Sequence, residues 1–302
     1  MGGRFLINGR IWEGEMPAEW KGGALLLPLS VIAERLGAQW QWISCTEQLM
    51  VEKDGRQLTL SLGQQTAFLQ GEKVPTGGLI YTNKDMVMVP VALISRYFDL
   101  SWMYVEDIDA VVLNRTEPAL KGKLIMLDAG HGGDDTGAAS GELIESELNW
   151  DVVHRLASIL ALSGAEVQYT RSQGETMSLS QRVNLVMEAE ADLLISVHHN
   201  SFLHAEINGT ETYWYHSWPA HQLAECIQNH VLEELRTVNR GIKEAAFFLL
   251  RHSTAVPVVV KVGFLTGSHD SAILGDRWMR ERAALGIFRG IREYIEGRLR
   301  QM

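Results

Sequence analysis

Cysteine is scarce in this sequence, since the 302 residues include only Cys45 and Cys226. Two cysteines exclude a disulfide framework and a cysteine-based zinc site, and we expect both to be buried apolar side chains. Basic residues are also outnumbered: 27 Lys and Arg against 37 Asp and Glu give a net charge of −10. This balance argues against nucleic acid or an anionic membrane as a main partner, because both attract clustered Lys and Arg.

Long hydrophobic runs are missing as well, and no stretch reaches the ~20 apolar residues of a membrane-spanning helix. The N-terminal MGGRFLINGRIWEGEMPAEW lacks the apolar run of ~7–15 residues that a secretory signal needs. We therefore expect a chain that either is cytosolic or has lost a leader. What is present is 46% hydrophobic and 21% charged residues, typical of a globular protein with a real core, and the length favours two domains.

Histidine is absent from the first part of the chain, because all 10 histidines occur at or after His131. That part instead carries an internal repeat, in which LLLPLSVIAERLGAQWQW (25–42) aligns without gaps on VMVPVALISRYFDLSWMY (87–104). Each copy predicts a short strand, a helix opened by proline and a second strand with aromatic residues. Hairpin strands around the Asp54-Gly55 turn lie between the copies. The repeat predicts a small α+β domain made of two similar halves.

This region, roughly residues 4–115, resembles the copper amine oxidase N-terminal-like domain, a module often attached to bacterial wall enzymes. Copper is not implied, because the region has no imidazole to offer a metal. Its tryptophans could form a binding surface, but we expect them to fill the small core. By analogy, the module would position the chain on glycan or on a partner. We set the domains at 1–118 and 119–302, with the boundary in the polar stretch NRTEPALKGK (114–123).

From residue 123 on, strand and helix patterns alternate along the chain. This alternation predicts an α/β fold, a mostly parallel twisted sheet flanked by helices. The predicted strands are KLIMLDAG (123–130), AEVQYTR (165–171), ADLLISVHHN (191–200), GTETYWYH (209–216) and VPVVVKVGF (256–264), and the predicted helices span 147–164, 178–190, 219–238 and 276–298.

Polar residues follow the carboxyl ends of these strands, where open α/β sheets bind ligands. His131 lies in the glycine-rich turn LDAGHGGDDTG, which matches neither phosphate-binding glycine pattern. Glu145 precedes the first helix of this half, and His198 ends a strand. Neighbouring strand residues point to opposite faces, so only one of His198 and His199 can face a site. Two histidines and a carboxylate with an open fourth position suit catalytic zinc, although their long spacing also fits separate structural roles.

Eight motifs give this half a specific resemblance. They occur in the order and spacing of the zinc-dependent N-acetylmuramoyl-L-alanine amidases of the amidase 3 type, over residues 123–300. The motifs are LIMLDAGHGGDDTGA, ESELNW, GAEVQYTRS, SLSQRV, ADLLISVHHNS, GTETYWY, NRGIKEAAFFLLRHSTAVPVVV and VGFLTG.

The resemblance implies a hydrolase that cleaves the amide between N-acetylmuramic acid and the L-alanine of the peptidoglycan stem peptide. It implies one zinc ion per chain, bound by His131, Glu145 and His198, which lowers the pKa of a bound water. It also implies a place in the cell wall or outside the cell, with the signal peptide absent from this chain. Peptidoglycan is then the partner, and the oligomeric state cannot be read from the sequence.

Lys261 departs from the family pattern. The family has a glutamate in an ExGF motif at the end of the last strand, which accepts the proton of the water, whereas this chain has KVGF. A protonated lysine cannot accept a proton, and beside a divalent cation it adds repulsion of roughly several kcal/mol at a separation of about 5 Å. Because loss of a general base costs about two to four orders of magnitude in rate, we expect impaired hydrolysis.

Several interpretations of Lys261 remain open. It could be neutral and act as the base itself, or Asp134, Asp135 or Glu244 could replace the missing carboxylate. The site could instead be impaired or inactive, by nature or by design. The alternative from another class is a non-catalytic peptidoglycan-binding or activator protein, and a purely structural α/β module is a third. The short segment HHNSFLHAEINGTET leaves no room for the zinc-blocking helix found in some relatives, so we expect no such autoinhibition.

Overall fold

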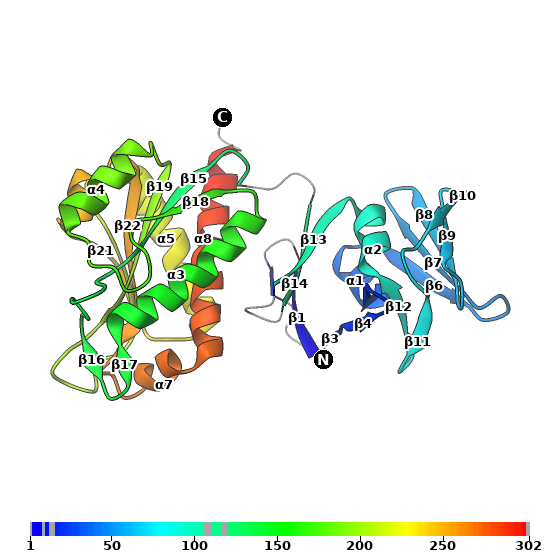
Figure 1. The fold of residues 1–302 in the computed structure, drawn as a ribbon, viewed down its shortest axis with the longest axis horizontal. Helices are drawn as coiled ribbons and strands as arrows, with labels where there is room; N and C mark the ends of the chain where they lie inside the picture. The colour runs from blue at the N-terminus through cyan, green and yellow to red at the C-terminus, as the bar shows by residue number, and fades with distance from the viewer. Residues whose placement is uncertain (1, 8–9, 12–15, 106–109, 116–119, 300–302) are drawn as a thin grey trace. The chain divides into compact units, whose positions relative to one another are not determined.

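The computed structural model describes residues 2–7, 10–11, 16–105, 110–115 and 120–299 (Figure 1). The chain divides into two compact units, residues 1–116 and 117–302. The domain boundary expected between residues 118 and 119 lies outside the described residues. The first unit is the small α+β domain and the second is the mixed α/β domain that the sequence predicts.

The first unit packs small sheets around one aliphatic core. Within the described residues the sheet orders are β13-β14-β1-β2 with β3 on β1, β10-β9-β8-β7-β6, and β11-β12-β5-β4. The elements are β1 (Gly2–Ile7), β2 (Arg10–Ile11), β3 (Met16–Pro17), β4 (Glu19–Lys21), β5 (Ala24–Pro28), α1 (Leu29–Arg35), β6 (Gln39–Ile43), β7 (Gln48–Lys53), β8 (Arg56–Ser61), β9 (Thr66–Leu69), β10 (Glu72–Pro75), β11 (Tyr81–Asn83), β12 (Met86–Pro90), α2 (Val91–Phe98), β13 (Leu100–Val105) and β14 (Ala110–Arg115).

The predicted internal repeat is confirmed. Each copy folds as strand, helix and strand, β5-α1-β6 in the first and β12-α2-β13 in the second. The first strands of the two copies pair with each other in antiparallel direction, with Met88 opposite Pro28 and Pro90 opposite Leu26. The Asp54-Gly55 turn joins β7 to β8 with positive φ at both residues, 50° and 77°, as a tight hairpin turn requires.

The predictions for the tryptophans and for Cys45 are wrong in part or in full. Trp20, Trp40 and Trp102 do not fill the core, since they remain 53%, 41% and 36% exposed. Trp42 does pack, partly buried, against the core, which is built mainly from aliphatic residues. Cys45 is also exposed, whereas Cys226 in the second unit is half-buried.

The second unit is built on a six-stranded sheet of order β18-β15-β19-β22-β20-β21. Of its pairings only β20 with β22 is antiparallel, so the predicted mostly parallel sheet is confirmed. The elements are β15 (Leu124–Ala129), β16 (Ala139–Ser140), β17 (Leu143–Ile144), α3 (Glu145–Leu162), β18 (Glu166–Tyr169), α4 (Leu179–Glu188), β19 (Leu193–Asn200), β20 (Thr210–Trp214), α5 (Trp218–Leu235), β21 (Asn239–Glu244), α6 (Phe248–His252), β22 (Val256–Phe264), α7 (Asp270–Gly275) and α8 (Arg277–Leu299).

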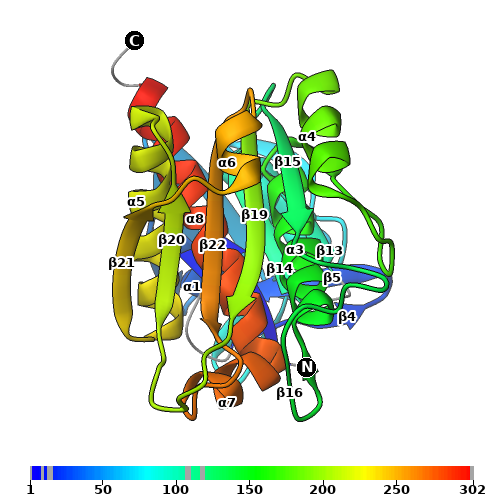
Figure 2. The ribbon, with the colours of Figure 1, turned by 90° about the vertical axis from the view of Figure 1, so that its left-hand side faces the viewer.

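Helices cover both faces of this sheet. Figure 2 shows α3, α5 and α8 on one face and α4 and α6 on the other. Met126 and Leu194 point from β15 and β19 to the α4 and α6 side, where they pack with Val183 and Leu249. Because side chains alternate along a strand, Asp128, Ser196 and His198 lie on this same face.

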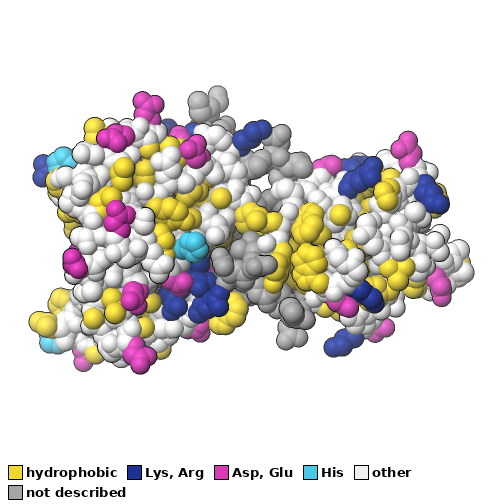
Figure 3. Space-filling view, in the orientation of Figure 1, with side chains coloured by type: hydrophobic (Ala, Val, Ile, Leu, Met, Phe, Trp, Pro, Cys, Tyr) yellow, Lys and Arg dark blue, Asp and Glu magenta, His cyan; other side chains and the backbone are white. Residues whose placement is uncertain are grey.

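Acidic side chains are dispersed over the face of this unit that Figure 3 shows. In the space-filling view, Asp and Glu side chains are scattered over its visible face, while hydrophobic side chains reach the surface of both units (Figure 3).

No helix among the described residues is long and apolar enough to cross a membrane. Residues 201–209, between β19 and β20, contain no helix, as expected from the short loop.

Candidate metal centre

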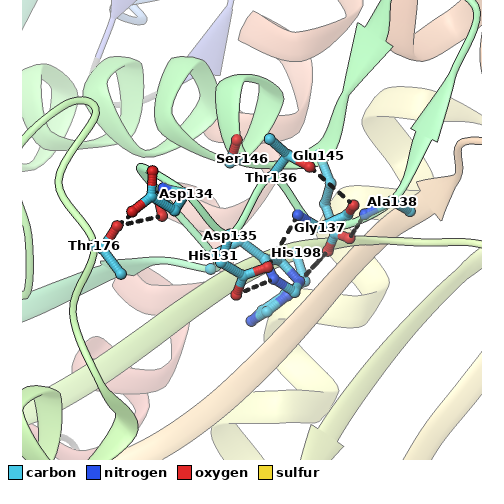
Figure 4. A network of polar contacts seen from close by, with 12 residues as sticks. His131, Asp134, Asp135, Thr136, Gly137, Ala138, Glu145, Ser146, Thr176 and His198 are labelled. Carbon is cyan, nitrogen blue, oxygen red and sulfur yellow. Dashed lines mark hydrogen bonds and ion pairs between the residues drawn. The ribbon is translucent and has the colours of Figure 1, made fainter.

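The structure brings His131, Glu145 and His198 together at the carboxyl ends of β15 and β19 (Figure 4). His131 follows β15, Glu145 is the first residue of α3, and His198 lies near the end of β19. Glu145 Oε1 is 3.3 Å from His131 Nε2 and 3.0 Å from His198 Nδ1. The ligand atoms of the three residues all lie within 4.8 Å of one another. One carboxylate oxygen and two imidazole nitrogens form the donor set of a catalytic zinc site, so the residues fit this metal.

The loop that presents His131 is held by two buried arginines. His131 has a φ of 61°, a strained value for a residue other than glycine. Its carbonyl oxygen accepts a hydrogen bond from Arg182 Nη2 at 2.7 Å, and Arg171 Nε donates to the carbonyl of Ala129 at 2.7 Å. On the ring, Nδ1 contacts Asp135 Oδ2 at 2.9 Å, which leaves Nε2 directed at Glu145. These contacts hold the loop and orient the ring of His131.

Two glycines leave the space that the three candidate metal-binding side chains need in order to lie close together. A Cβ atom on Gly130 would lie 2.2 Å from the His198 ring. A Cβ atom on Gly137, which has a φ of 67°, would lie 2.7 Å from both Glu145 and His131. A side chain at either position would displace a candidate ligand.

A buried charge network lies beneath the loop. Asp128 is fully buried and accepts hydrogen bonds from Arg182 Nη1 at 2.8 Å, from Thr170 at 2.5 Å and from Ser196 at 2.5 Å. Burial alone would raise the pKa of Asp128, but Arg182 and the two hydroxyl groups hold that pKa below its usual range. Arg182 thus links the ionised carboxylate of Asp128 to the backbone of the His131 loop.

Glu145 is the common partner of the site and is only 4% exposed. Burial opposes its charge, yet the hydrogen bonds with His131 and His198 lower its pKa far below the usual range. The bond to Glu145 raises the pKa of His131, whereas burial lowers the pKa of His198. His199 points the other way: its Nδ1 lies 2.7 Å from Asn149 Oδ1 on α3, and burial lowers its pKa to about 3. The expectation that only one of the two neighbouring histidines faces the site is confirmed.

Lys261 faces this centre from β22. It pairs with His198 across the two parallel strands, and its Nζ lies 3.9 Å from Glu145 Oε1. The side chain is 17% exposed. Burial lowers the pKa of Lys261, while the charges of Glu145 and Glu211 act in the opposite direction. A lysine amine thus approaches the oxygen that both histidines share.

Residues 125–293 match the N-acetylmuramoyl-L-alanine amidase family, which is more than half of the chain. The chain belongs to this family. Residues 6–113 match the copper amine oxidase N-terminal domain. The second unit is therefore called the amidase unit below.

Relatives of known name agree with the assignment. The chain is 36% identical over 186 residues to the N-acetylmuramoyl-L-alanine amidase LytC of Bacillus subtilis (strain 168), an alignment of 61% of this chain and 38% of LytC. It is 35% identical over 180 residues to YqiI of the same organism, across 59% of this chain and 87% of YqiI. The amidase AmiC2 of Nostoc punctiforme superposes with a TM-score of 0.56 at 33% identity, covering 59% of this chain and 99% of AmiC2.

Of the carboxylates considered as substitutes for the family's glutamate, none faces Glu145 as Lys261 does. Asp135 contacts Nδ1 of His131, the ring nitrogen turned away from Glu145. Asp134 lies beside Thr176, with its backbone nitrogen 3.0 Å from the Thr176 hydroxyl (Figure 4). Glu244 is in β21, three strands from His198 in the sheet order, and pairs with His216 at 2.9 Å.

Sequence reasoning missed a further carboxylate in the amidase unit, Glu211. It stands opposite Lys261 on β20 and is only 2% exposed. Its Oε1 binds Arg240 Nε at 2.5 Å and Lys243 Nζ at 2.9 Å. The motifs GTETYWY and NRGIKE already contained these residues. Their connection could not be seen because it depends on the parallel pairing of β20 with β21.

Proposed function

We propose that the chain is a zinc-dependent peptidoglycan hydrolase whose rate is limited by Lys261. The bond cleaved is the amide between N-acetylmuramic acid and the L-alanine of the stem peptide. The convergence of His131, Glu145 and His198 on one point within an amidase fold carries the proposal, because it supplies the donor set of a catalytic zinc site. When bound there, zinc polarises the scissile carbonyl and lowers the pKa of water. We place the protein in the cell wall or outside the cell, where this substrate occurs.

The residues around the centre would bind the cation, orient a ligand and transfer protons. Glu145 stays ionised because both histidines hydrogen-bond to it, so it can hold a cation at neutral pH. Asp135 fixes the ring of His131 through Nδ1, which keeps Nε2 available as a ligand. Lys261 can donate a proton to the leaving amine, but in its charged form it cannot accept one from water. One of the two proton transfers that amide hydrolysis needs is therefore unsupported.

A second candidate, a peptidoglycan-binding protein without turnover, is favoured by the contact between Lys261 Nζ and Glu145 Oε1 at 3.9 Å. In this arrangement the ammonium neutralises the ligand carboxylate and competes with a metal for it. The site would then bind wall fragments without cleaving them.

Hydrolysis of purified peptidoglycan by the wild-type chain and by Lys261→Glu tests the proposal, with zinc content measured on both and Lys121→Glu as the control. Lys121 precedes β15, at the opposite end of the strand from the site. We expect Lys261→Glu to release stem peptide about a hundredfold faster or more, as restored general-base catalysis predicts. Slow wild-type release supports the impaired hydrolase, and binding without release supports the second candidate. Equal rates in the two proteins would show that the base lies elsewhere.

A further inference from the structure

Three basic side chains lie side by side on the strands beyond the metal centre. Along the sheet order β19-β22-β20-β21, the face that carries His198 continues with Lys261, then Glu211, then Arg240 and Lys243. Three cations thus lie beside two buried carboxylates, since Arg240 and Lys243 contact Glu211 and Lys261 stands between Glu211 and Glu145. A local excess of positive charge in a chain of net charge −10 indicates a site for an anion.

A bulge in β21 directs Arg240 toward this face. Thr210 pairs with Asn239 and Thr212 with Ile242, so two residues of β21, Arg240 and Gly241, stand opposite Glu211 alone. Gly241 has a φ of 78°, which a residue other than glycine rarely adopts. Bulges of this kind re-aim a side chain and are frequent beside active sites.

The position of Arg240 is fixed by contacts that leave its outer nitrogens available. Its side-chain stem passes over Gly209, where an added Cβ would lie 2.8 Å from Arg240 Cγ, and its guanidinium lies 5.1 Å from the centre of the Phe264 ring. Nε donates to Glu211 at 2.5 Å, but among the described residues Nη1 and Nη2 make no hydrogen bond. These two parallel donors have the geometry that binds a carboxylate.

Lys243 and two aromatic rings complete the surface. Lys243 Nζ lies 2.9 Å from Glu211 Oε1 while its side chain stays 38% exposed, so it can contact a second group. Tyr213, which also hydrogen-bonds to Glu211, contacts Phe247 at 5.0 Å between ring centres. Phe247 is 41% exposed. Cations beside an apolar wall suit an acidic peptide better than an uncharged sugar.

We propose that Arg240 and Lys243 bind a carboxylate of the stem peptide, which would make them specificity residues for acidic rather than amidated stems. This inference rests on the proposed function, since it assumes that the scissile amide lies at His131, Glu145 and His198. From there the stem continues across β22 and β20. Strands are spaced by about 4.8 Å, so a carboxylate one or two residues beyond the amide reaches the guanidinium of Arg240.

The test compares two disaccharide tripeptides, one with free stem carboxylates and one with every carboxylate converted to an amide. Binding to the zinc-loaded full chain is measured by titration calorimetry, with chromatography to show that the peptide stays attached. Arg240→Gln and Lys243→Gln are compared with Lys121→Gln. If Arg240→Gln unfolds by circular dichroism because Glu211 loses its partner, Lys243→Gln alone decides, since its side chain is more exposed.

We expect the wild-type chain to bind the acidic fragment about tenfold more tightly than the amidated one, the effect of a charge-assisted hydrogen bond. Arg240→Gln and Lys243→Gln should each reduce this preference to less than about threefold by weakening only the binding of the acidic fragment. Lys121→Gln should keep the preference. Equal affinities of the wild-type chain for the two fragments, or an unchanged preference in the variants, overturn the inference alone. A wild-type chain that binds neither fragment overturns the proposed function as well.

Discussion

Asp128 determines, at the scale of single residues, how firmly the ligand loop is held. Its carboxylate neutralises Arg182, which in turn binds the backbone of His131. Asp128→Asn keeps the shape but removes the charge that Arg182 needs in a fully buried place. We expect the free energy of unfolding at pH 7 to fall by about 3–5 kcal/mol, as for other broken buried pairs. Urea unfolding of the variant beside the wild-type chain measures it.

The same pair predicts a pH dependence. The pKa of Asp128 is lower in the folded chain than in the unfolded one, so its contribution to stability is complete above the ordinary carboxyl pKa and is lost as the pH falls below it. The difference in unfolding free energy between wild type and Asp128→Asn should therefore shrink below about pH 4. A difference that stays constant from pH 7 to pH 3 would mean that the effect is one of shape and not of charge.

At the scale of elements, the glycine that follows β15 leaves room for the His198 ring of the neighbouring strand β19. Gly130→Ala should push the His198 ring out of place, since the added Cβ would lie 2.2 Å from it. We expect the zinc affinity to fall at least tenfold, measured by competition with a chelator, while the circular dichroism spectrum is retained. Gly275→Ala is the matched control, because its Cβ would make only an ordinary 3.7 Å contact with Leu143. Stoichiometric zinc of unchanged affinity in Gly130→Ala would show that His198 is not a ligand.

Elements with strong local signals could be predicted from the sequence. The helix predicted at 178–190 is α4, and Ser178 and Gln181 form a complete capping box at its start. The segment NRGIKE was not predicted as a strand, because its bulge breaks the alternation of polar and apolar residues. The short helix α6 was missed because its five residues are fewer than two turns.

The residues of the candidate site, too, could be predicted where a local sequence motif contained them. His131, Glu145 and His198 could be named because their motifs keep the family spacing. Glu211 could not be identified, because its importance comes from the pairing of two strands that are distant in the sequence. Glu211 lies opposite Lys261, which follows it by 50 residues. Distant pairings are set by the whole sheet and not by local pattern.

At the scale of the whole molecule, the two units have separate cores. Among the described residues, the core cluster of the first unit consists of side chains between Phe5 and Leu113. We therefore expect residues 120–302 alone to fold cooperatively and to bind the same amount of zinc as the full chain, measured by thermal unfolding and metal analysis. If the first unit positions the chain on the wall, the fragment should sediment with peptidoglycan at least several-fold less well. Unchanged sedimentation would reject that role, and a fragment that does not fold would reject the independence of the units.

The central place of β22 in the sheet has a consequence for synthesis. This strand separates β19 from β20, yet it is made after both of them and after α5 and β21. While the ribosome is still adding residues 201–255, the edge of β19 that faces β22 in the finished sheet has no lasting partner, and no strand joins β20 and β21 to β19. The amidase unit can therefore close only when nearly the whole chain has emerged, and until then its two sheet edges are open to wrong pairing or to a chaperone. The strand that brings Lys261 to the site also ends this vulnerable period.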